Sequence, residues 1–253
     1  VGGGSAGCVL AARLSEDPAR RVLLIEAGGK DNNILFHLPA GFAKMTKGIA
    51  SWGWSTVPQK HLKNRVLWYT QAKVIGGSAS MTTEIYTRGN ALDYDGWAQA
   101  GCTGWSFREI VKYFRKSEDN EVYDNDWHGK GGPLGVSQPR GALPICEAFI
   151  HAAEQYGIPR NDDLSAPDPT GFGFYQLTQR NVRRSSTAVA YLRPAMNRPN
   201  LTVMMTEMVG RIVVSGNRAT GVEIRRGGGT EIISGGEVIV TSGAIGSPRL
   251  VML

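Results

Sequence analysis

The sequence lacks long apolar runs and contains little cysteine. No apolar stretch approaches the ~18 residues of a membrane-spanning helix, and no signal-peptide pattern is present, so neither export nor a membrane span can be argued. Only three cysteines occur among 253 residues, and their wide spacing matches no metal or redox motif. We expect a globular protein of a reducing compartment whose cysteines are buried or half-buried.

The sequence also lacks a concentrated block of positive charge. Its net charge of +6 is spread along the chain, and the densest pairs are Arg183-Arg184 and Arg225-Arg226. We expect both pairs to lie on the solvated surface. Nucleic acid is therefore not implied as a partner, whereas weak attraction to an anionic membrane surface stays open.

Glycine, in contrast, is placed with regularity at the start of the chain. Gly2, Gly4 and Gly7 fit the pattern Gly-x-Gly-x-x-Gly. In this turn the first glycine allows the bend, the second lets phosphates approach the backbone, and the third lets the following helix pack against the preceding strand. The pattern is typical of a helix N-terminus that binds a dinucleotide pyrophosphate, although a plain glycine loop gives the same letters.

The residues after this turn complete a strand-turn-helix-strand unit. An apolar-periodic helix is closed by Pro18, and residues 22–25 are continuously apolar, as in a buried parallel strand. Glu26 ends this strand, 19 positions after Gly7 (26 minus 7), close to the ~20-residue spacing of the acid that binds an adenosine ribose. An acid here favours NAD or FAD over NADP but does not separate the first two.

Both chain ends lack their usual neighbours. Only Val1 stands before the glycine turn, where a strand of about five residues is expected. At the other end, residues 250–253 form an apolar run with no capping residue after it. We expect the sequence to be an internal piece of a longer protein.

The middle of the chain predicts an irregular excursion followed by helices. Residues 31–70, with Trp52-Gly53-Trp54 among their aromatics, lack periodicity and predict an extended segment with short helical turns. The pair Gly76-Gly77 follows a short strand and suits a backbone that lies against a planar ligand, or an ordinary tight turn. A capping box at 106–109 starts one helix, and residues 144–156 form a second.

Histidine gives no metal signal in this region. His128 lies near Asp124, Asp126 and Asp162, but the spacing matches no ligand pattern, and we interpret these residues as loop polarity. His151 falls on the second helix and is expected to face solvent or to pack.

From residue 201 the pattern predicts strands, at 201–205, 211–214, 221–224, 231–233 and 237–240. The first four suit a β-meander, and the last has the continuous apolar character of a strand in a parallel sheet. A second glycine turn follows, with Ser247 as the expected N-cap and Pro248 as the first residue of a helix.

Three of these segments together resemble the glucose-methanol-choline (GMC) oxidoreductases, which are FAD enzymes that oxidise alcohols. The three, in the family's order, are residues 1–8, 76–80 running to 86–89, and 241–250. Shorter stretches resemble the choline-dehydrogenase-like branch, at residues 90–97, 104–106, 128–134 and 190–194.

The resemblance implies an α/β fold with an FAD-binding Rossmann-like parallel sheet and a β-meander, plus part of a substrate-binding α+β domain. The FAD-binding domain would comprise residues 1–90 and 186–253, with a partial substrate or cap region at 91–185. The pyrophosphate, ribose, adenine and flavin contacts would come from Gly2, Gly4, Ser5, Ala6, Gly7, Glu26, Gly76, Gly77, Ser78, Thr82, Val209, Ser242 and Gly243.

The family's catalytic histidine, with its second histidine or asparagine, has no match here and would lie beyond Leu253. The sequence also departs from the family at Met81-Thr82-Thr83, where Ile-Asn-Ala or Ile-Asn-Gly is usual, which puts the local flavin contacts in question. Some relatives attach FAD covalently through a histidine at the position of Met81. A thioether cannot form that link, so we expect non-covalent FAD.

The resemblance therefore implies hydride transfer from a small-molecule alcohol to flavin N5, with oxygen or a quinone as electron acceptor. We expect a cytoplasmic protein, with peripheral membrane association open. Two alternatives remain at this point: a non-catalytic flavin-binding fragment and an NAD-dependent dehydrogenase. The sequence does not identify the alcohol.

Overall fold

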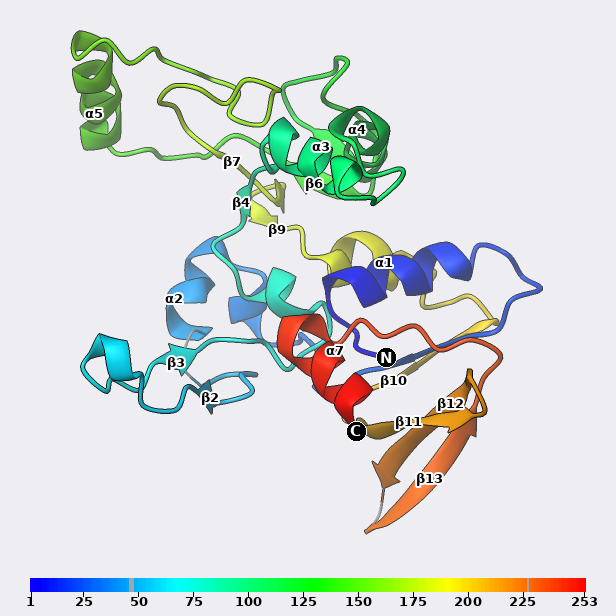
Figure 1. Ribbon diagram of the computed structural model, residues 1–253. Helices are drawn as coiled ribbons and strands as arrows, with labels where there is room; N and C mark the ends of the chain where they lie inside the picture. Colours follow the sequence, from blue (N-terminus) through cyan, green and yellow to red (C-terminus); the bar gives the residue numbers. More distant parts are fainter. Residues whose placement is uncertain (46–47, 227) are drawn as a thin grey trace. The chain divides into compact units, whose positions relative to one another are not determined.

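The computed structural model describes residues 1–45, 48–226 and 228–253, and it divides into two compact units (Figure 1). Unit 1 comprises Val1–Thr83 and Ser186–Leu253, and unit 2 comprises Glu84–Ser185. Unit 1 is therefore built from two segments that unit 2 separates in the sequence.

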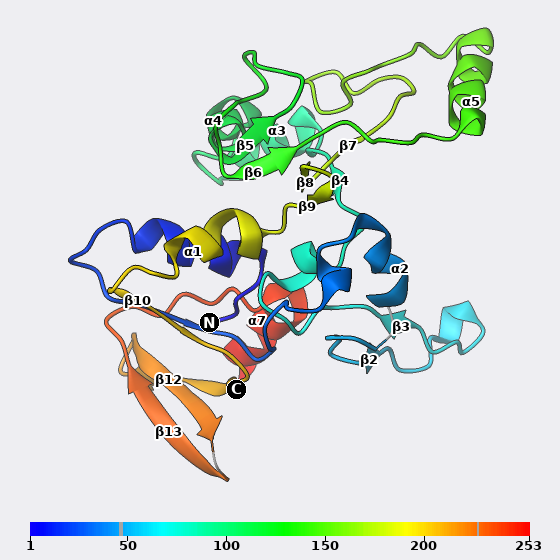
Figure 2. The ribbon, with the colours of Figure 1, turned by 180° about the vertical axis from the view of Figure 1, so that it is seen from behind.

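The first helix and strand of unit 1 form as the sequence predicts. Helix α1 (Ser5–Leu14) follows Gly4, whose extended backbone ends the glycine turn. Its buried residues are all small, namely Gly7, Cys8, Ala11 and Ala12. Small side chains let α1 lie close to its neighbours, and in both ribbon views it runs alongside strands β1 (Val22–Ile25) and β10 (Leu201–Met204) (Figures 1 and 2). These two strands pair in parallel, with Val22 opposite Leu201.

The expected excursion of short elements follows β1. Its elements are η1 (Ile34–Phe36), η2 (Pro39–Gly41), α2 (Phe42–Met45), β2 (Trp54–Ser55), η3 (Lys60–Leu62), β3 (Trp68–Tyr69) and η4 (Gly77–Ser80). One apolar cluster, made by Phe36, Met45, Ala72, Val74 and Met81, joins η1 and α2 to the residues on either side of η4. The excursion therefore has its own small core.

The second segment of unit 1 returns through η5 (Ala188–Leu192), α6 (Arg193–Ala195) and β10, and then forms the β-meander. Its three antiparallel strands are β11 (Met208–Ser215), β12 (Arg218–Arg226) and β13 (Gly229–Ser234). A second cluster, made by Ile25, Val209, Val222, Ile224 and Leu250, joins the meander to β1. The predicted meander is confirmed for β11, β12 and β13, each longer than the sequence pattern indicated. The strand expected at 201–205 is not part of it, because β10 pairs in parallel with β1.

Two sequence predictions at the end of unit 1 are wrong. Residues 237–240 form no strand in the described part of the chain; instead Val1 joins this segment, donating its N-terminal N–H to the Ile239 carbonyl at 2.7 Å and accepting from the Thr241 N–H at 2.7 Å. Helix α7 (Gly243–Met252) begins after Ser242 rather than Ser247, so Pro248 lies inside the helix and not at its first position.

Unit 2 has three helices and short strand pairs among its described residues. Its elements are β4 (Ile85–Tyr86), α3 (Ala91–Gln99), α4 (Phe107–Ser117), β5 (Glu118–Asn120), β6 (Leu134–Val136), α5 (Pro144–Gln155), β7 (Gln176–Leu177), β8 (Gln179–Arg180) and β9 (Arg183–Arg184). The predicted capping box is present, since the Glu109 carboxylate accepts from the Ser106 N–H at 3.2 Å and the Ser106 side chain accepts from the Glu109 backbone. Helix α5 begins at the expected proline.

Buried charged groups in unit 2 overturn one further expectation. Arg184 is only 2 % exposed and pairs with the buried Glu84 at 3.0 Å, so it is not solvated surface. His128 lies in the loop between β5 and β6, as expected, and its side chain is fully buried. The carboxylates that make burial of these two cations tolerable come from segments that the local sequence pattern does not connect.

Two further expectations concerned the burial of the cysteines and the absence of long apolar runs. Cys8 is buried and Cys146 half-buried, as expected, but Cys102 is exposed, contrary to expectation. Within the described ranges no helix is both long enough and apolar enough to cross a membrane.

Candidate functional site

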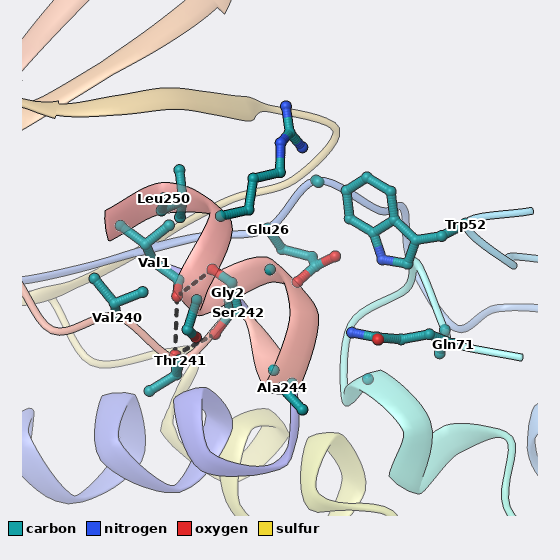
Figure 3. Close-up of a pocket in the computed structure, with 18 of the residues that line it drawn as sticks. Val1, Gly2, Glu26, Trp52, Gln71, Val240, Thr241, Ser242, Ala244 and Leu250 are labelled. Atoms are coloured by element: carbon teal, nitrogen blue, oxygen red, sulfur yellow. Dashed lines mark hydrogen bonds between the residues drawn. The ribbon is translucent and has the colours of Figure 1, made fainter. Parts of the chain in front are cut away.

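A cavity of about 550 Å³ in unit 1 lies where the three glycine-bearing segments meet (Figure 3). Gly4 from the first turn, Gly77 from the second and Gly243 from the third all line it. Its volume falls in the ~300–1,000 Å³ range of small-molecule and cofactor sites. Three segments that are distant in the sequence therefore share one concave surface.

Most of the residues expected to contact a cofactor line this cavity. They are Gly2, Gly4, Ser5, Ala6, Glu26, Gly77, Ser78, Val209, Ser242 and Gly243. Gly7, Gly76 and Thr82 are not among the lining residues. Gly7 and Gly76 are buried, whereas Thr82 is exposed.

The glycines of the first turn differ in what surrounds them. Gly2 has φ +100°, a left-handed conformation that favours glycine, and donates its N–H to the Ile25 carbonyl at 2.8 Å. A Cβ at Gly7 would overlap the Gly2 carbonyl oxygen, so α1 reaches the turn only because position 7 has no side chain. A Cβ at Gly4 would meet nothing nearer than 3.9 Å and would occupy cavity space. Gly7 therefore serves packing, and Gly4 keeps the cavity open.

The second glycine turn packs against the first, backbone to backbone. The Gly76 N–H donates to the Gly3 carbonyl at 2.7 Å. A Cβ at Gly77, which has φ +58°, would lie 2.7 Å from the Cα of Gly4. Only a glycine permits this approach, and the contact places Gly77 on the wall of the cavity.

Two helices of ten residues direct their N-terminal ends to the cavity. Neither the N-cap of α1, Gly4, nor that of α7, Ser242, makes a side-chain capping bond among the described residues. The first N–H groups of a helix have no partner inside the helix, and they carry its partial positive charge. Two such ends on one cavity fit an anion such as a pyrophosphate.

Glu26 places a carboxylate on the same cavity at the end of β1. It is 7 % exposed, and its two oxygens accept the Gly3 and Gly28 N–H groups, each at 2.7 Å. Burial raises the pKa of Glu26, and these two N–H groups and the Lys73 ammonium oppose the rise. Each carboxylate oxygen keeps a further lone pair, so the group is able to accept hydrogen bonds from ribose hydroxyls.

The base of the cavity is held by hydroxyl groups that the sequence analysis did not single out for that role. Thr241 Oγ1 lies 3.0 Å from the Val1 carbonyl oxygen and 2.7 Å from that of Gly2, and Ser242 Oγ donates to Val1 at 3.1 Å (Figure 3). These bonds fix the third turn against the first. Their signal in the sequence was the Thr-Ser pair directly before Gly243.

Sequence analysis also missed an aromatic wall of the cavity, formed by Trp52, Trp54 and Tyr69. The two indoles stack with ring centroids 5.2 Å apart and planes at 26°. Tyr69 lies opposite Trp54 in the two-stranded β2–β3 sheet. The closely spaced tryptophans were visible in the sequence, but no local pattern showed that they face a cavity.

The buried histidine of unit 2 lies between two carboxylates. His128 Nδ1 is 2.8 Å from Glu118, and its Nε2 is 3.0 Å from Asp163. Burial alone would lower the pKa of His128, but the hydrogen bonds to Asp163 and Glu118 prevail and raise it to about 8. Glu118 also accepts from Arg88 at 2.8 Å. No group of three or more potential ligand side chains with metal-binding geometry occurs in the part of the chain that the structure describes.

Comparison with known proteins finds matches that extend over the whole chain. The sequence profile described as GMC oxidoreductase matches residues 1–253. The chain is 41% identical to a mitochondrial choline dehydrogenase of Mus musculus, over 100% of the chain and 44% of that protein. It is 40% identical to an oxygen-dependent choline dehydrogenase of Sinorhizobium fredii, over 100% of the chain and 46% of that protein.

Solved structures agree with the sequence matches. Pyridoxine 4-oxidase from Mesorbium loti superposes with a TM-score of 0.95 at 33% identity, covering 99% of this chain and 50% of its own. An FAD-dependent oxidoreductase from Chaetomium thermophilum superposes with a TM-score of 0.93 at 29% identity, covering 99% and 46%. The chain thus spans about half the length of the proteins it matches.

Proposed function

This chain belongs to the GMC oxidoreductase family, and from that membership we propose that the whole protein is an FAD-dependent enzyme that oxidises an alcohol to a carbonyl compound. One observation carries the proposal: Gly4, Gly77 and Gly243, from three distant segments, line a single cavity.

The residues present fit a flavin dinucleotide. The space that a Cβ at Gly4 would fill lies in front of the α1 N-terminus, where a pyrophosphate needs close access to backbone N–H groups. Glu26 lies at the end of β1, where the ribose of a bound dinucleotide is expected. Val209 lies on β11, an edge strand of the meander, whose outward backbone groups are available to an adenine.

In this proposal the chain binds and orients the cofactor. Bound FAD supplies the hydride acceptor for the alcohol carbon. Gly2, Gly4, Ser5, Ala6 and Gly7 form the phosphate turn, with Gly7 acting through packing.

The remaining contacts come from the two later turns. Gly76, Gly77, Ser78 and Thr82 would lie beside the flavin, and Ser242 and Gly243 would close the third side. We propose that the base that takes the hydroxyl proton lies outside this chain, because none of its four histidines lines the cavity.

We propose that FAD is held without a covalent link. Met81 is 5 % exposed and packs in the cluster with Phe36 and Met45, and it does not line the cavity. Its thioether has no nucleophilic N–H or thiol to join to a flavin. Flavin that stays with the polypeptide after denaturation in acid would contradict this part of the proposal.

The domain assignment follows the same logic. Residues 1–90 and 186–253 would form the FAD-binding domain, and 91–185 would belong to a substrate or cap region.

The alcohol and the electron acceptor, oxygen or a quinone, are proposed partners of the whole protein, and no feature described above implies nucleic acid. We propose a cytoplasmic location; whether the protein also associates with a membrane is decided by sedimentation with anionic vesicles.

An absorbance spectrum of the purified whole protein tests the proposal. Bands near ~370 and ~450 nm are expected from a bound flavin, and an alcohol substrate such as choline should bleach the second band without oxygen. Bands without bleaching by any alcohol would favour a non-catalytic flavin-binding protein. Absence of the bands, with NAD-dependent alcohol oxidation, would contradict the proposal in favour of an NAD enzyme.

A further inference from the structure

We propose that the aromatic wall, led by Trp52, is the surface against which the adenosine half of the dinucleotide packs. This inference rests on the proposed function and adds a contact that the glycine turns do not provide. It assigns a role in cofactor binding to Trp52, Trp54 and Tyr69, which belong to none of the three glycine turns.

Trp52 lies at the same end of the cavity as Glu26. Both Trp52 and Glu26 line it, and in Figure 3 the Glu26 carboxylate points toward the side on which the Trp52 indole lies. Lys73 lies near both residues. Its ammonium is 4.9 Å from the Trp52 ring centroid, and its positive charge opposes the rise that burial causes in the pKa of Glu26. The wall therefore belongs to the carboxylate end of the cavity.

The carboxylate end is the sugar and base end of a dinucleotide. Glu26 follows β1 at the position of the acid that binds the adenosine ribose, while the phosphates belong at the helix N-termini. Val209 and Leu250 line the same cavity and belong to one apolar cluster, so an apolar surface is available there besides the indole. An aromatic base attached to that ribose meets apolar and aromatic surface, which suits its flat, weakly polar faces.

The indole is also held in place before any ligand arrives. Trp54 stacks on Trp52, and the Lys73 ammonium makes a cation–π contact with it. The backbone N–H of Trp52 donates to the Gln71 carbonyl at 2.9 Å, which fixes the segment that carries the indole. A side chain already fixed loses little further freedom on binding, so its contact contributes to affinity.

Substitution of Trp52 tests the role, with ligands that separate the two halves of FAD. Removing an aromatic surface from a base weakens binding by about tenfold or more. We expect Trp52→Leu in the whole protein to weaken FAD binding, measured from flavin fluorescence released on dilution of the holoenzyme, by about tenfold. Calorimetric titration of the protein freed of FAD should show ADP weakened to the same degree and FMN, which lacks adenosine, unchanged.

Two control variants complete the design. Trp52→Phe keeps an aromatic ring and should retain most of the ADP affinity. Trp105→Leu changes a tryptophan of unit 2 that is 53% exposed and does not line the cavity, and it should leave all three affinities unchanged.

The outcomes separate this inference from the proposed function. Unchanged ADP affinity in Trp52→Leu, or equal weakening of FMN and ADP, would overturn the role of the wall even in a working flavoenzyme. If the wild-type protein bound ADP but no flavin, the proposed function would fail, and the ADP titrations would still decide the inference. If Trp52→Leu does not fold, a Trp52→Phe variant in which the ADP and FMN affinities both fall about tenfold would also overturn it.

Discussion

At the scale of single residues, the glycines of the first turn divide into two kinds. Gly7 has no room for a side chain, whereas Gly4 has room within the protein and faces the cavity. The sequence pattern treats them alike, because spacing records where glycine stands and not what its missing Cβ would meet. Folding and binding roles are therefore separable by experiment at two glycines of one motif.

We predict that Gly4→Ala weakens FAD binding by about tenfold or more while leaving the free energy of unfolding of the FAD-free protein nearly unchanged. The added methyl occupies the space in front of the α1 N-terminus. Gly7→Ala, in contrast, is expected to lower both FAD affinity and stability, because its methyl overlaps the Gly2 carbonyl. Flavin fluorescence and urea unfolding measure the two effects. Equal losses of stability in both variants would contradict the division.

The buried His128 leads to a pH prediction. Its pKa is raised from 6.5 to about 8 in the folded protein, so its contribution to stability is fully present below pH 6.5 and disappears as the pH rises through 8. The shift corresponds to on the order of 2 kcal/mol. We expect urea unfolding of the wild type to lose about this much free energy between pH 6 and pH 9, and His128→Gln to lose little.

His151→Gln is the matched control, because His151 is an exposed partner of Glu154. This variant should keep the wild-type dependence on pH. A wild-type slope in His128→Gln would show that other groups produce it.

At the scale of elements, sequence reasoning worked where the signal was local. The capping box at Ser106 and the proline at the start of α5 predicted both helices, since helix ends are set by neighbours within a few positions. The error at 237–240 arose because strand pairing needs a partner, and an apolar run does not show which segment supplies one; in the described residues this segment bonds Val1. The aromatic wall was invisible for the same reason: only the folded chain shows what it faces.

The meander supplies a prediction at this scale. Ile224 of β12 is fully buried in the cluster that includes Val209 of the cavity. We expect Ile224→Val to lower the free energy of unfolding by about 1 kcal/mol and Ile224→Ala by about 2–5 kcal/mol. Ile232→Ala, on β13 and 56 % exposed, should change it by less than about 0.5 kcal/mol. Urea unfolding checks the series, and equal effects at both positions would contradict the assigned core.

At the scale of the whole molecule, the three glycine segments predicted one shared site, and their residues do line one cavity. What the sequence did not provide was the interior of unit 2, where the partners of His128 are ten and 35 positions away. Charge pairing at such separations depends on how loops close, which no periodicity encodes. The cavity was predictable because its turns carry glycine, and the ion pairs were not.

A hydrogen-exchange experiment tests the division into units. We expect saturating FAD to slow amide exchange most strongly in α1, β1 and β11, because a ligand at ~100 times its dissociation constant stabilises the elements that hold it by about 2.7 kcal/mol. Helices α3, α4 and α5 of unit 2 should change less. Protection concentrated in residues 91–185 would contradict the placement of the cofactor in unit 1.

The bonds between Val1 and Thr241 have a consequence for biosynthesis. A ribosome adds ~5–20 residues per second, so on the order of tens of seconds separate the emergence of these two residues. Unit 2 is contiguous and leaves the ribosome complete, while the nascent unit 1 still waits for its second segment. The cavity therefore forms only after both segments of unit 1 have been made, and the turn at residues 2–7 waits for Thr241 before its bonds are complete.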